Sequence, residues 1–329
     1  MKICSISMVK DEADIIESFV RFGLSFLDYM VILDNGSTDN TGLILEKLKA
    51  EGKNIEVISH PSAGYDQALF MNELLAYASE KYSPDFIIPL DADEFLDADC
   101  NPRDILSRLP PKYAYTISWR TYLPRDGTPL PPFLPFGMAF YRDARYENFK
   151  KVIIPCEVTR KYAIRLATGN HKVFGIGDNL VKNIESLRMG HFPIRSREQF
   201  QSKVILGVIR HMCNGQMQAG MGMHLMRPYC AIKYDNQYDL FEEALNFANF
   251  TNAPFTLFHP GVLNTEFCGE IDIRYADLSN VSYLKNILGM CESMADLIHC
   301  VYQANAPEKG AEGLGSLRRV LQESLESKE

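Results

Sequence analysis

Residues 86–95 read Phe-Ile-Ile-Pro-Leu-Asp-Ala-Asp-Glu-Phe, an apolar run that ends in three carboxylates. The run 86–90 predicts a buried strand, and Asp91 and Asp93 follow where the chain would leave the sheet. Two like charges so close together repel each other and resist burial unless something compensates them. A divalent cation does so well, because carboxylate oxygens suit Mg²⁺ or Mn²⁺ and the ion can in turn hold a diphosphate. Taken alone, the pattern is equally typical of a solvated acidic turn.

The first hundred residues alternate between strand-like and helix-like segments. Short apolar runs predict strands, and apolar residues three or four positions apart predict the helices between them. This order is typical of a mostly parallel sheet that helices cover on both faces. We therefore expect an α/β, Rossmann-like fold. The expected strands are 3–9, 29–33, 55–58 and 86–90, and the expected helices are 13–27, one that ends near 51, and 67–82.

Polar residues follow three of these strands at the point where each strand ends. The three clusters are Lys-Asp-Glu at 10–12, Asp-Asn-Gly-Ser-Thr-Asp at 34–39 and Asp-Ala-Asp-Glu at 91–94. The carboxyl ends of parallel strands meet at one edge of a sheet, and open α/β sheets bind their ligands outside that edge. Three polar clusters at one edge therefore predict a binding site there.

Charge and cysteine content argue against several classes of protein. A formal net charge of −8 over 329 residues disfavours a nucleic-acid partner, which would need a basic face. The eight cysteines are scattered without a CxxC pair, so neither a zinc motif nor a disulfide framework is expected. The N-terminal apolar run is too short for a signal peptide, and no apolar stretch reaches the roughly 20 residues that span a bilayer. We expect a cytoplasmic protein with reduced thiols and no transmembrane segment.

The rest of the chain is expected to add a long loop and a helical C-terminal part. Residues 124–135 hold five prolines and predict the loop. Ser196 and Gln199 have the spacing of a capping box before a helix whose apolar face ends at Met212. Beyond it the chain is expected to be mainly helical, with the Met-rich stretch 217–226 in a core or interface. The expected units are a catalytic domain (1–210), a helical region (211–305) and a mobile tail (306–329).

Three N-terminal stretches resemble motifs of the family 2 glycosyltransferases, which have the GT-A fold, and are also similar to glycosyltransferase family 92. Residues 8–16 are similar to the Lys-Asn-Glu strand–helix motif that opens these enzymes, with Asp11 in place of the usual Asn. Residues 33–41 resemble their Asp-Asn-Gly-Ser-Thr-Asp-Gly-Thr loop. Residues 90–95 resemble their Asp-x-Asp-Glu-Phe element.

A fourth stretch extends the resemblance toward the end of the catalytic domain. Residues 190–200 are similar to a His-Tyr-x-x-Lys-Ser-x-Glu-Glu-Phe motif, with Phe192 and Arg195 in place of Tyr and Lys. All four motifs occur in the family's order, and the likeness covers roughly residues 1–210. The resemblance implies a GT-A nucleotide-diphospho-sugar transferase.

The resemblance also implies roles for particular residues toward a divalent ion (Mn²⁺ or Mg²⁺) and a nucleotide-sugar donor. Asp93 would ligate the ion, His191 would be a distant second ligand, and Asp91 would approach the ion or the ribose. Arg195 would offer a cation to the diphosphate. The implied donor-binding residues are Lys10, Glu12, Asp34, Asn35, Ser37, Asp39, Asp91, Ala92, Glu94 and Arg195, and the implied metal ligands are Asp91, Asp93 and His191.

Likeness to family 2 further implies inversion at the anomeric carbon, for which the acceptor hydroxyl needs a base within hydrogen-bond reach. The base is expected between the acidic loop and His191. We hypothesise that it is His171 or Asp178. The other acidic side chains considered in this interval are Glu147, Glu157 and Glu185.

The expected function is metal-dependent transfer of a sugar from a nucleotide sugar, with UDP as the expected nucleotide, to a saccharide or other glycoconjugate, as in polysaccharide biosynthesis. A nucleotidyltransferase is an alternative, but it predicts a glycine-rich phosphate loop and residues 8–14 contain no glycine. A catalytically inactive nucleotide-sugar-binding protein is the other alternative, which intact Asp91, Asp93 and His191 disfavour. Peripheral membrane contact and a homo-oligomer stay open.

Overall fold

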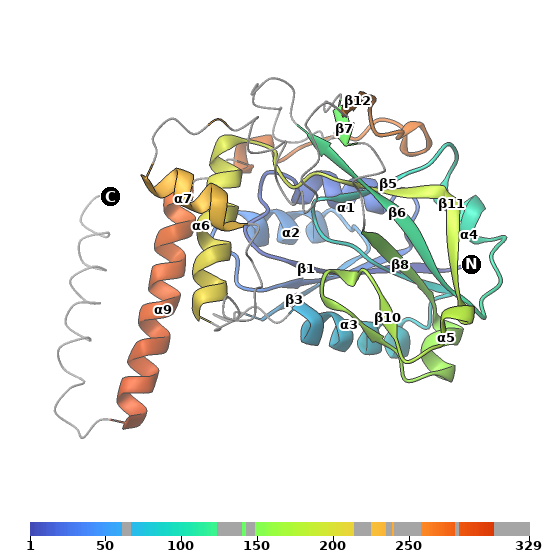
Figure 1. Ribbon diagram of the computed structural model, residues 1–329, viewed down its shortest axis with the longest axis horizontal. Coiled ribbons are helices and arrows are strands. Elements are labelled where there is room, and N and C mark those ends of the chain that lie inside the picture. Colours follow the sequence, from blue (N-terminus) through green and yellow to red (C-terminus); the bar gives the residue numbers. More distant parts are fainter. Residues whose placement is uncertain are drawn as a thin grey trace.

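The computed structural model describes residues 1–60, 67–123, 140–142, 149–213, 225–234, 239, 258–279 and 283–305. In this part of the chain a twisted sheet runs through the molecule, with helices on both of its faces (Figure 1). The sheet has the strand order β12-β7-β6-β8-β4-β1-β2-β3, and β11 and β5 join it beside β6. Its strands are β1 (Ile3–Val9), β2 (Tyr29–Asp34), β3 (Ile55–Ser59), β4 (Phe86–Pro89), β5 (Glu94–Asp97), β6 (Ala114–Leu123), β7 (Phe140–Arg142), β8 (Lys150–Pro155), β11 (Val181–His191) and β12 (Phe258–Pro260).

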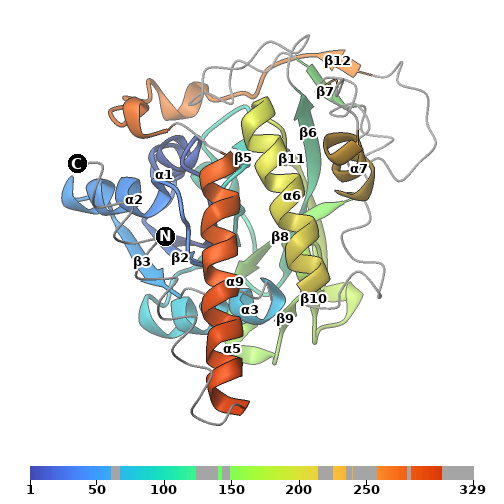
Figure 2. The same ribbon diagram turned by 90° about the vertical axis from the view of Figure 1, so that its left-hand side faces the viewer.

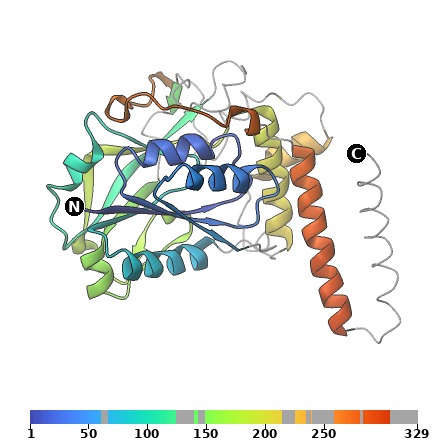
Figure 3. The same ribbon diagram turned by 180° about the vertical axis from the view of Figure 1, so that it is seen from behind.

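The first four strands form the parallel half of the sheet. β1 pairs in parallel with both β2 and β4, and β2 pairs in parallel with β3. All seven residues of β1 are buried, which explains its continuous apolar sequence. Two hydrophobic clusters, one on each face, hold the helices to the strands. Figure 3 shows α1 (Ile16–Gly23) and α2 (Thr41–Ala50) on one face, and α3 (Gln67–Lys81) and α5 (Cys156–Lys161) on the other.

Beyond β4 the pairing becomes mainly antiparallel. β8 pairs antiparallel with β4 and β6, and β7 pairs antiparallel with β6 and β12. β11 runs parallel to β6 and antiparallel to β5. The mixed α/β fold class expected from the sequence is confirmed. A separate small pair joins β9 (Arg165–Leu166) to β10 (Val173–Phe174).

Several expected elements differ at their ends. The helix expected over 13–27 is α1, which is shorter because a turn comes first, in which the N–H of Ile15 donates to Glu12 O at 3.0 Å. Strand β8 ends at Pro155, and α5 follows it directly. Gly52 ends the second helix with a φ of +79°, a conformation that glycine adopts without strain.

The carboxyl edge of the parallel strands faces a helical end of the molecule (Figure 2). There α6 (Arg197–Cys213) lies against α7 (Met226–Tyr234) and α9 (Tyr283–Asn305), so the helical C-terminal region is confirmed for these elements. Phe200, Val204 and Val208 of α6 are buried as expected, whereas Met212 is 51% exposed because it points away from that core. Residues 124–135, 217–224 and 306–329, about which the sequence made predictions, lie outside the described residues.

The described residues that follow α7 include a segment that the sequence did not predict. Residues 261–279 run largely without regular structure, and Leu263 and Phe267 pack against the core below α1. No helix in the described ranges combines the length and the apolarity that a membrane crossing needs.

Candidate active site

The three polar clusters predicted from the sequence do meet at one edge of the sheet. Val9 at the end of β1 is level with Asp34 at the end of β2. Ile6 is level with Pro89, so Asp91 emerges beside the end of β1. The N–H of Asn35 donates to Val9 O at 3.0 Å and fixes the two chain exits side by side.

The first group of carboxylates at this edge, Asp11, Asp34 and Asp39, is held by backbone amides and hydroxyls; we name it the amide-bound cluster. Asp34 Oδ1 accepts from Ser37 N at 2.8 Å and Ser37 Oγ at 2.7 Å. Asp11 Oδ1 accepts from Thr38 N at 2.7 Å, which links the turns after β1 and β2. Asp39 accepts from the N–H groups of residues 13 and 41. These bonds shape the loop over residues 34–41.

Burial affects the charge of Asp39 in this cluster. Burial, with a further contribution from the nearby Asp11 carboxylate, raises the pKa of Asp39 to about 6. Hydrogen bonds from Thr41 and Ala13 act in the opposite direction but are weaker.

The second group, Asp91, Asp93 and Glu94, is held by lysine ammonium groups; we name it the lysine-bound cluster. Lys151 of β8 is 1% exposed, and its Nζ lies 2.8 Å from Asp91 Oδ2 and 2.6 Å from Glu94 Oε1. The same Nζ donates to Gly169 O at 2.7 Å. Burial raises the pKa of Glu94 to about 8 even though the Lys151 charge acts to lower it. Lys151 therefore offsets part of the cost of burying Glu94, and it also forms an ion pair with Asp91.

Asp93 receives its compensation from a different side. Lys203 of α6 donates to Asp93 Oδ2 at 2.8 Å, and its side chain is 31% exposed. His191 Nε2 lies 3.7 Å from the same oxygen, and Arg195 Nη1 lies 3.9 Å from it. Burial alone would raise the pKa of Asp93, but the charges of Lys203 and Arg195 bring it well below its usual range. Asp93 is therefore a buried carboxylate that stays ionised.

Strand pairing brings His191 to Asp93 across nearly a hundred residues of sequence. β11 pairs antiparallel with β5 so that His191 is level with Glu94. The N–H of Phe192 donates to Asp93 O at 2.8 Å. Burial lowers the pKa of His191 well below its usual value, so its imidazole is neutral.

These two side chains fit a divalent ion as a pair of protein ligands. A neutral imidazole and an ionised carboxylate are both ligands that Mn²⁺ accepts. His191 Nδ1 is buried and has no hydrogen-bond partner in the described part of the chain, so no contact there restrains the ring. In that same part, no group of three His, Cys, Asp or Glu side chains could hold an ion by itself. Oxygens of a bound diphosphate would have to complete the coordination.

Arg195 does not point at a diphosphate, contrary to the sequence-based expectation. Its Nη2 donates to Glu12 at 2.6 Å, its Nε donates to Asp14 at 2.7 Å, and its Nη1 donates to Phe192 O at 3.1 Å. The side chain is 7% exposed. Arg195 and Glu12 therefore form an internal ion pair that ties the start of α6 to the turn after β1. The physical reason is the fixed fork of the guanidinium, which two carboxylates already satisfy.

The proposed base His171 lies within the site, in an aromatic group. Its ring is 5.0 Å from Trp119 and 4.6 Å from Phe149, and Trp119 is in turn 4.2 Å from His191, all between ring centroids. His171 Nδ1 lies 2.9 Å from Lys150 O, so this nitrogen carries the proton and Nε2 has a lone pair. Burial lowers the pKa of His171 to about 4.

Asp178, the other proposed base, lies far from this group. It begins the short turn η4 (Asp178–Leu180) immediately before β11, whereas His191 is the last residue of β11. An extended strand rises about 3.3 Å per residue, which separates the two by about 30 Å. The expectation for Asp178 is wrong because the sequence does not reveal that residues 181–191 form one long strand.

The remaining predicted donor-binding residues all lie at this edge. Lys10 is partly buried, and Asn35 and Ala92 are almost fully buried, at 1% and 3% exposed. Ala92 therefore lines the core, not a ligand surface. The hydroxyl of Ser37 already donates a hydrogen bond to Asp34.

Sequence reasoning missed Lys151, Trp119 and Gln67. Gln67 Nε2 donates to Asp91 Oδ1 at 3.1 Å, and its Oε1 accepts from Gly169 N at 2.9 Å. The one available signal was for Lys151, a charged residue inside the apolar strand sequence Lys-Lys-Val-Ile-Ile at 150–154. A buried lysine within such a strand predicts a paired carboxylate.

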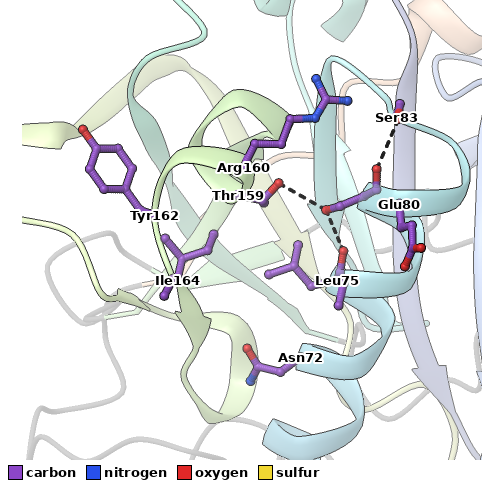
Figure 4. Close-up of a pocket in the computed structure, with 11 residues that line it drawn as sticks. Asn72, Leu75, Glu80, Ser83, Thr159, Arg160, Tyr162 and Ile164 are labelled. Carbon is purple, nitrogen blue, oxygen red and sulfur yellow. Dashed lines mark hydrogen bonds between the residues drawn. The ribbon is translucent and has the colours of Figure 1, made fainter.

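A hollow elsewhere on the molecule contains none of the predicted residues. It lies between α3 and α5, has a volume of about 420 Å³, and is lined by residues such as Asn72, Ser79 and Thr159 (Figure 4). Polar groups on its wall bond within the protein: Ser79 Oγ donates to Leu75 O at 2.7 Å, and Asn72 Nδ2 donates to Leu166 O at 3.1 Å. These polar groups of the hollow are therefore already engaged within the protein and are poorly suited to bind a ligand.

Comparison with protein families gives a match for the N-terminal part of the chain. Residues 12–156 match the model of the family described as "Glycosyl transferase family 2". This part of the chain is therefore similar to family 2 glycosyltransferases. The resemblance to family 2 that the sequence predicted is confirmed over these residues. A comparison with curated proteins found no match.

Solved structures similar to this chain include glycosyltransferases at low identity. S. aureus TarS is 14% identical over 72% of this chain and 44% of that chain, with a TM-score of 0.39. TarS 1–349 in complex with UDP is 15% identical over 63% of this chain and 65% of that chain, with a TM-score of 0.37. The mannosyltransferase PcManGT from Pyrobaculum calidifontis, in complex with GDP-Man and Mn²⁺, is 11% identical over 97% of this chain and 80% of that chain, with a TM-score of 0.35. The chain thus spans less than half of that TarS chain.

Proposed function

We propose that the protein transfers a sugar, with inversion, from a nucleotide sugar to a saccharide or other glycoconjugate acceptor, with a divalent ion, in the synthesis of polysaccharide or a related glycan. UDP is the nucleotide that we propose for the donor. The observation that carries the proposal is Asp93, a buried ionised carboxylate on which Lys203 and His191 converge at the carboxyl edge of the sheet. Such a site would hold a divalent ion and, through that ion, a charged diphosphate.

The amide-bound cluster would hold the nucleoside of the donor. Asp34, Ser37 and Asp39 are locked into one loop conformation by their own hydrogen bonds, which presents a preformed surface. Lys10, from the turn after β1, borders the same loop. Preformed polar loops bind without an ordering cost, which favours their use for a constant part of the substrate.

The lysine-bound cluster would manage the charge of the diphosphate. Asp93 and His191 would hold the divalent ion, which when bound stabilises the charge that develops on the leaving diphosphate. Lys203 is the cation in this group with a substantially exposed side chain, so it can contact a phosphate oxygen without unburying the others. Lys151 would keep Asp91 and Glu94 aligned beside the sugar.

His171 would serve the acceptor as the base. Its Nδ1–H is held by Lys150 O, which leaves a neutral Nε2 lone pair that would accept the proton of the acceptor hydroxyl. Trp119 would provide an apolar wall for a sugar ring. The indole N–H of Trp119 is buried and has no partner within the described residues, so a sugar hydroxyl could satisfy it.

The proposal is tested by a screen of nucleotide sugars for slow hydrolysis, with and without Mn²⁺. Binding is followed separately by tryptophan fluorescence, because the sequence contains a single tryptophan, Trp119, which touches His191. We expect the fluorescence titration to show a higher affinity for UDP when Mn²⁺ is present. We also expect one nucleotide sugar to be hydrolysed. Mn²⁺-dependent UDP binding without hydrolysis of any donor would indicate an inactive binding protein. Absence of nucleotide binding would overturn the proposal.

A further inference from the structure

One side of α9 carries an exposed row of apolar and small side chains. Leu284, Leu288 and Ile298 are 57%, 53% and 60% exposed, and Cys291 and Ala295 between them are exposed as well. We name these five residues the α9 stripe. Their spacing alternates between four and three residues, the 3.5-residue repeat by which two helices pack along a seam.

The opposite side of α9 is already occupied by the protein. Asn286 is buried and donates to Ser202 Oγ of α6 at 3.0 Å, and Met290 is 4% exposed. Gly289 lies so close to Thr38 that a Cβ there would come within 2.5 Å of it. At 100° per residue the stripe is about half a turn away from these contacts. In Figures 1 and 2, α9 lies at the end of the molecule, with α6 beside it on the side of the sheet.

We propose that the α9 stripe is the interface with a second copy of this chain, in which the two α9 helices pack antiparallel about a two-fold axis at Cys291. This arrangement brings Leu284 opposite Ile298 of the second copy and Leu288 opposite Ala295, so large side chains meet large or small ones without a gap. A two-fold axis makes the same surface serve both copies, as in most soluble homodimers. Each copy thereby covers the apolar row of the other.

Charges beside the stripe select the antiparallel direction and the partner. Lys285 and Asp296 lie on the same flank of α9, and the antiparallel pair brings Lys285 of each copy opposite Asp296 of the other. In a parallel pair the equal flanks of the two helices would lie on opposite sides of the seam, so Lys285 would not meet Asp296 of the other copy. Glu292 is also exposed and lies next to the two-fold axis. It would face Glu292 of the second copy, and this contact between like charges is unfavourable. Acidic residues on this flank and the net charge of −8 disfavour an anionic lipid surface as the occupant.

The interface would bear on the active site through α9 itself. The inner side of α9 contacts Thr38 of the loop over residues 34–41, and it contacts Ser202, the neighbour of Lys203. A second copy would therefore support the helix that backs both clusters. The dimer does not depend on the proposed function, since its test measures mass alone.

The first test compares molar mass in solution by light scattering for three forms of the full chain. We expect a concentration-dependent dimer for the unchanged protein, a monomer for Leu288→Glu, and a dimer for the matched control Leu43→Glu. Leu43 lies on α2 and is 43% exposed, so both substitutions alter an exposed leucine. Circular dichroism checks that each variant folds. A monomer at every concentration, or a Leu288→Glu variant that still dimerises, would overturn the proposal.

Charge reversal and cross-linking test the orientation. Lys285→Glu and Asp296→Lys should each weaken the dimer by about tenfold or more, and the double variant should restore it, because the reversed charges again face each other. Glu292→Gln should tighten the dimer. A short bismaleimide should link two copies through Cys291, and Cys291→Ser should abolish the link although Cys100 and Cys230 are also exposed. Failure of the double variant to restore the dimer would contradict the antiparallel pair. Binding of the protein to lipid vesicles that depends on Leu288 would show that the α9 stripe contacts a membrane, and it would overturn the proposed dimer.

Discussion

Two clusters of carboxylates lie at the carboxyl edge of the sheet, and the protein compensates them in different ways. In the amide-bound cluster the partners are N–H and hydroxyl groups, such as those that Ser37 gives to Asp34. In the lysine-bound cluster they are the ammonium groups of Lys151 and Lys203. The first kind of partner belongs to the backbone of the loop or lies two bonds from it. The second kind sits at the end of a long side chain.

The two kinds of partner give the two clusters different roles, one in the shape of a loop and the other in the charge of the site. Backbone donors cannot leave without unfolding the loop, so the amide-bound cluster fixes the form of residues 34–41. An ammonium group on a flexible stem can be exchanged for another cation or turned toward a phosphate. The lysine-bound cluster thus retains negative charge that can interact with a ligand. In the amide-bound cluster the carboxylates are engaged in hydrogen bonds that shape the loop.

The largest expected effect follows from removal of the buried ammonium group. Lys151→Met leaves Asp91 and Glu94 uncompensated, so the free energy of unfolding should fall by about 3–5 kcal/mol in a urea titration. Lys150→Met is the matched control, because Lys150 is the exposed neighbour on the same strand, and it should change stability by less than about 0.5 kcal/mol. Addition of Glu94→Gln to Lys151→Met should recover part of the loss. Equal stability of the two lysine variants would show that Lys151 is not the counter-ion.

The next effect concerns turnover. Asp93→Asn keeps the size of the side chain but removes the charge on which Lys203 and His191 converge, so donor hydrolysis should fall by about a hundredfold or more. Asp104→Asn, an exposed change on α4 (Pro102–Leu106), serves as the control and should leave the rate unchanged. If Asp93→Asn retains the normal rate, the proposed role of Asp93 is wrong.

A smaller effect distinguishes the amide-bound cluster by pH. The pKa of Asp39 is about 6 in the folded protein, against an ordinary value of 3.8. Between these pH values the folded chain keeps a proton that the unfolded chain has lost, so this group makes stability fall as pH rises from about 4 to 6. Asp39→Asn should reduce that fall by about 1–2 kcal/mol in urea titrations at the two pH values. The Asp104→Asn variant should follow the unchanged protein, and an identical slope in both variants would refute the assignment.

The smallest expected effect concerns the stability contribution of Glu51, a carboxylate whose partner is the guanidinium of Arg21. Hydrogen bonds from Arg21, and more weakly from Tyr275, lower the pKa of Glu51 to about 2. A lowered pKa has the opposite sign: the stabilisation is complete above pH 4.5 and is lost as pH falls toward 2. Glu51→Gln should destabilise the protein by about 1 kcal/mol at pH 7 and by less at pH 3. An effect that grows on acidification would contradict this sign.

Much of the N-terminal fold could be predicted because its signals are local. The strands 3–9 and 29–33 are continuous apolar runs, and both are buried parallel strands. Their carboxyl ends were expected to meet, and Val9 and Asp34 are level in the sheet. The capping box at Ser196 is present too, since Ser196 Oγ accepts from Gln199 N at 3.1 Å, although Gln199 returns its own bond to Arg195 N.

The partners of the charged groups could not be predicted, because they come from strands far apart in sequence. Nothing near Lys151 in the sequence indicates Asp91 or Glu94; the antiparallel pairing of β8 with β4 and β6 brings them together. The same limitation misdirected the expectations for Arg195, whose carboxylates lie some 180 residues away, and for Asp178.

Hydrophobic runs and turn residues act on their nearest neighbours, so the amino-acid sequence is sufficient to predict that three acidic and polar turns follow buried parallel strands. The packing of distant elements selects the carboxylate that keeps an exchangeable charge. That outcome depends on which cation the sheet and α6 bring within about 3 Å, and on how much water burial removes, and the energy of a buried charge depends on both.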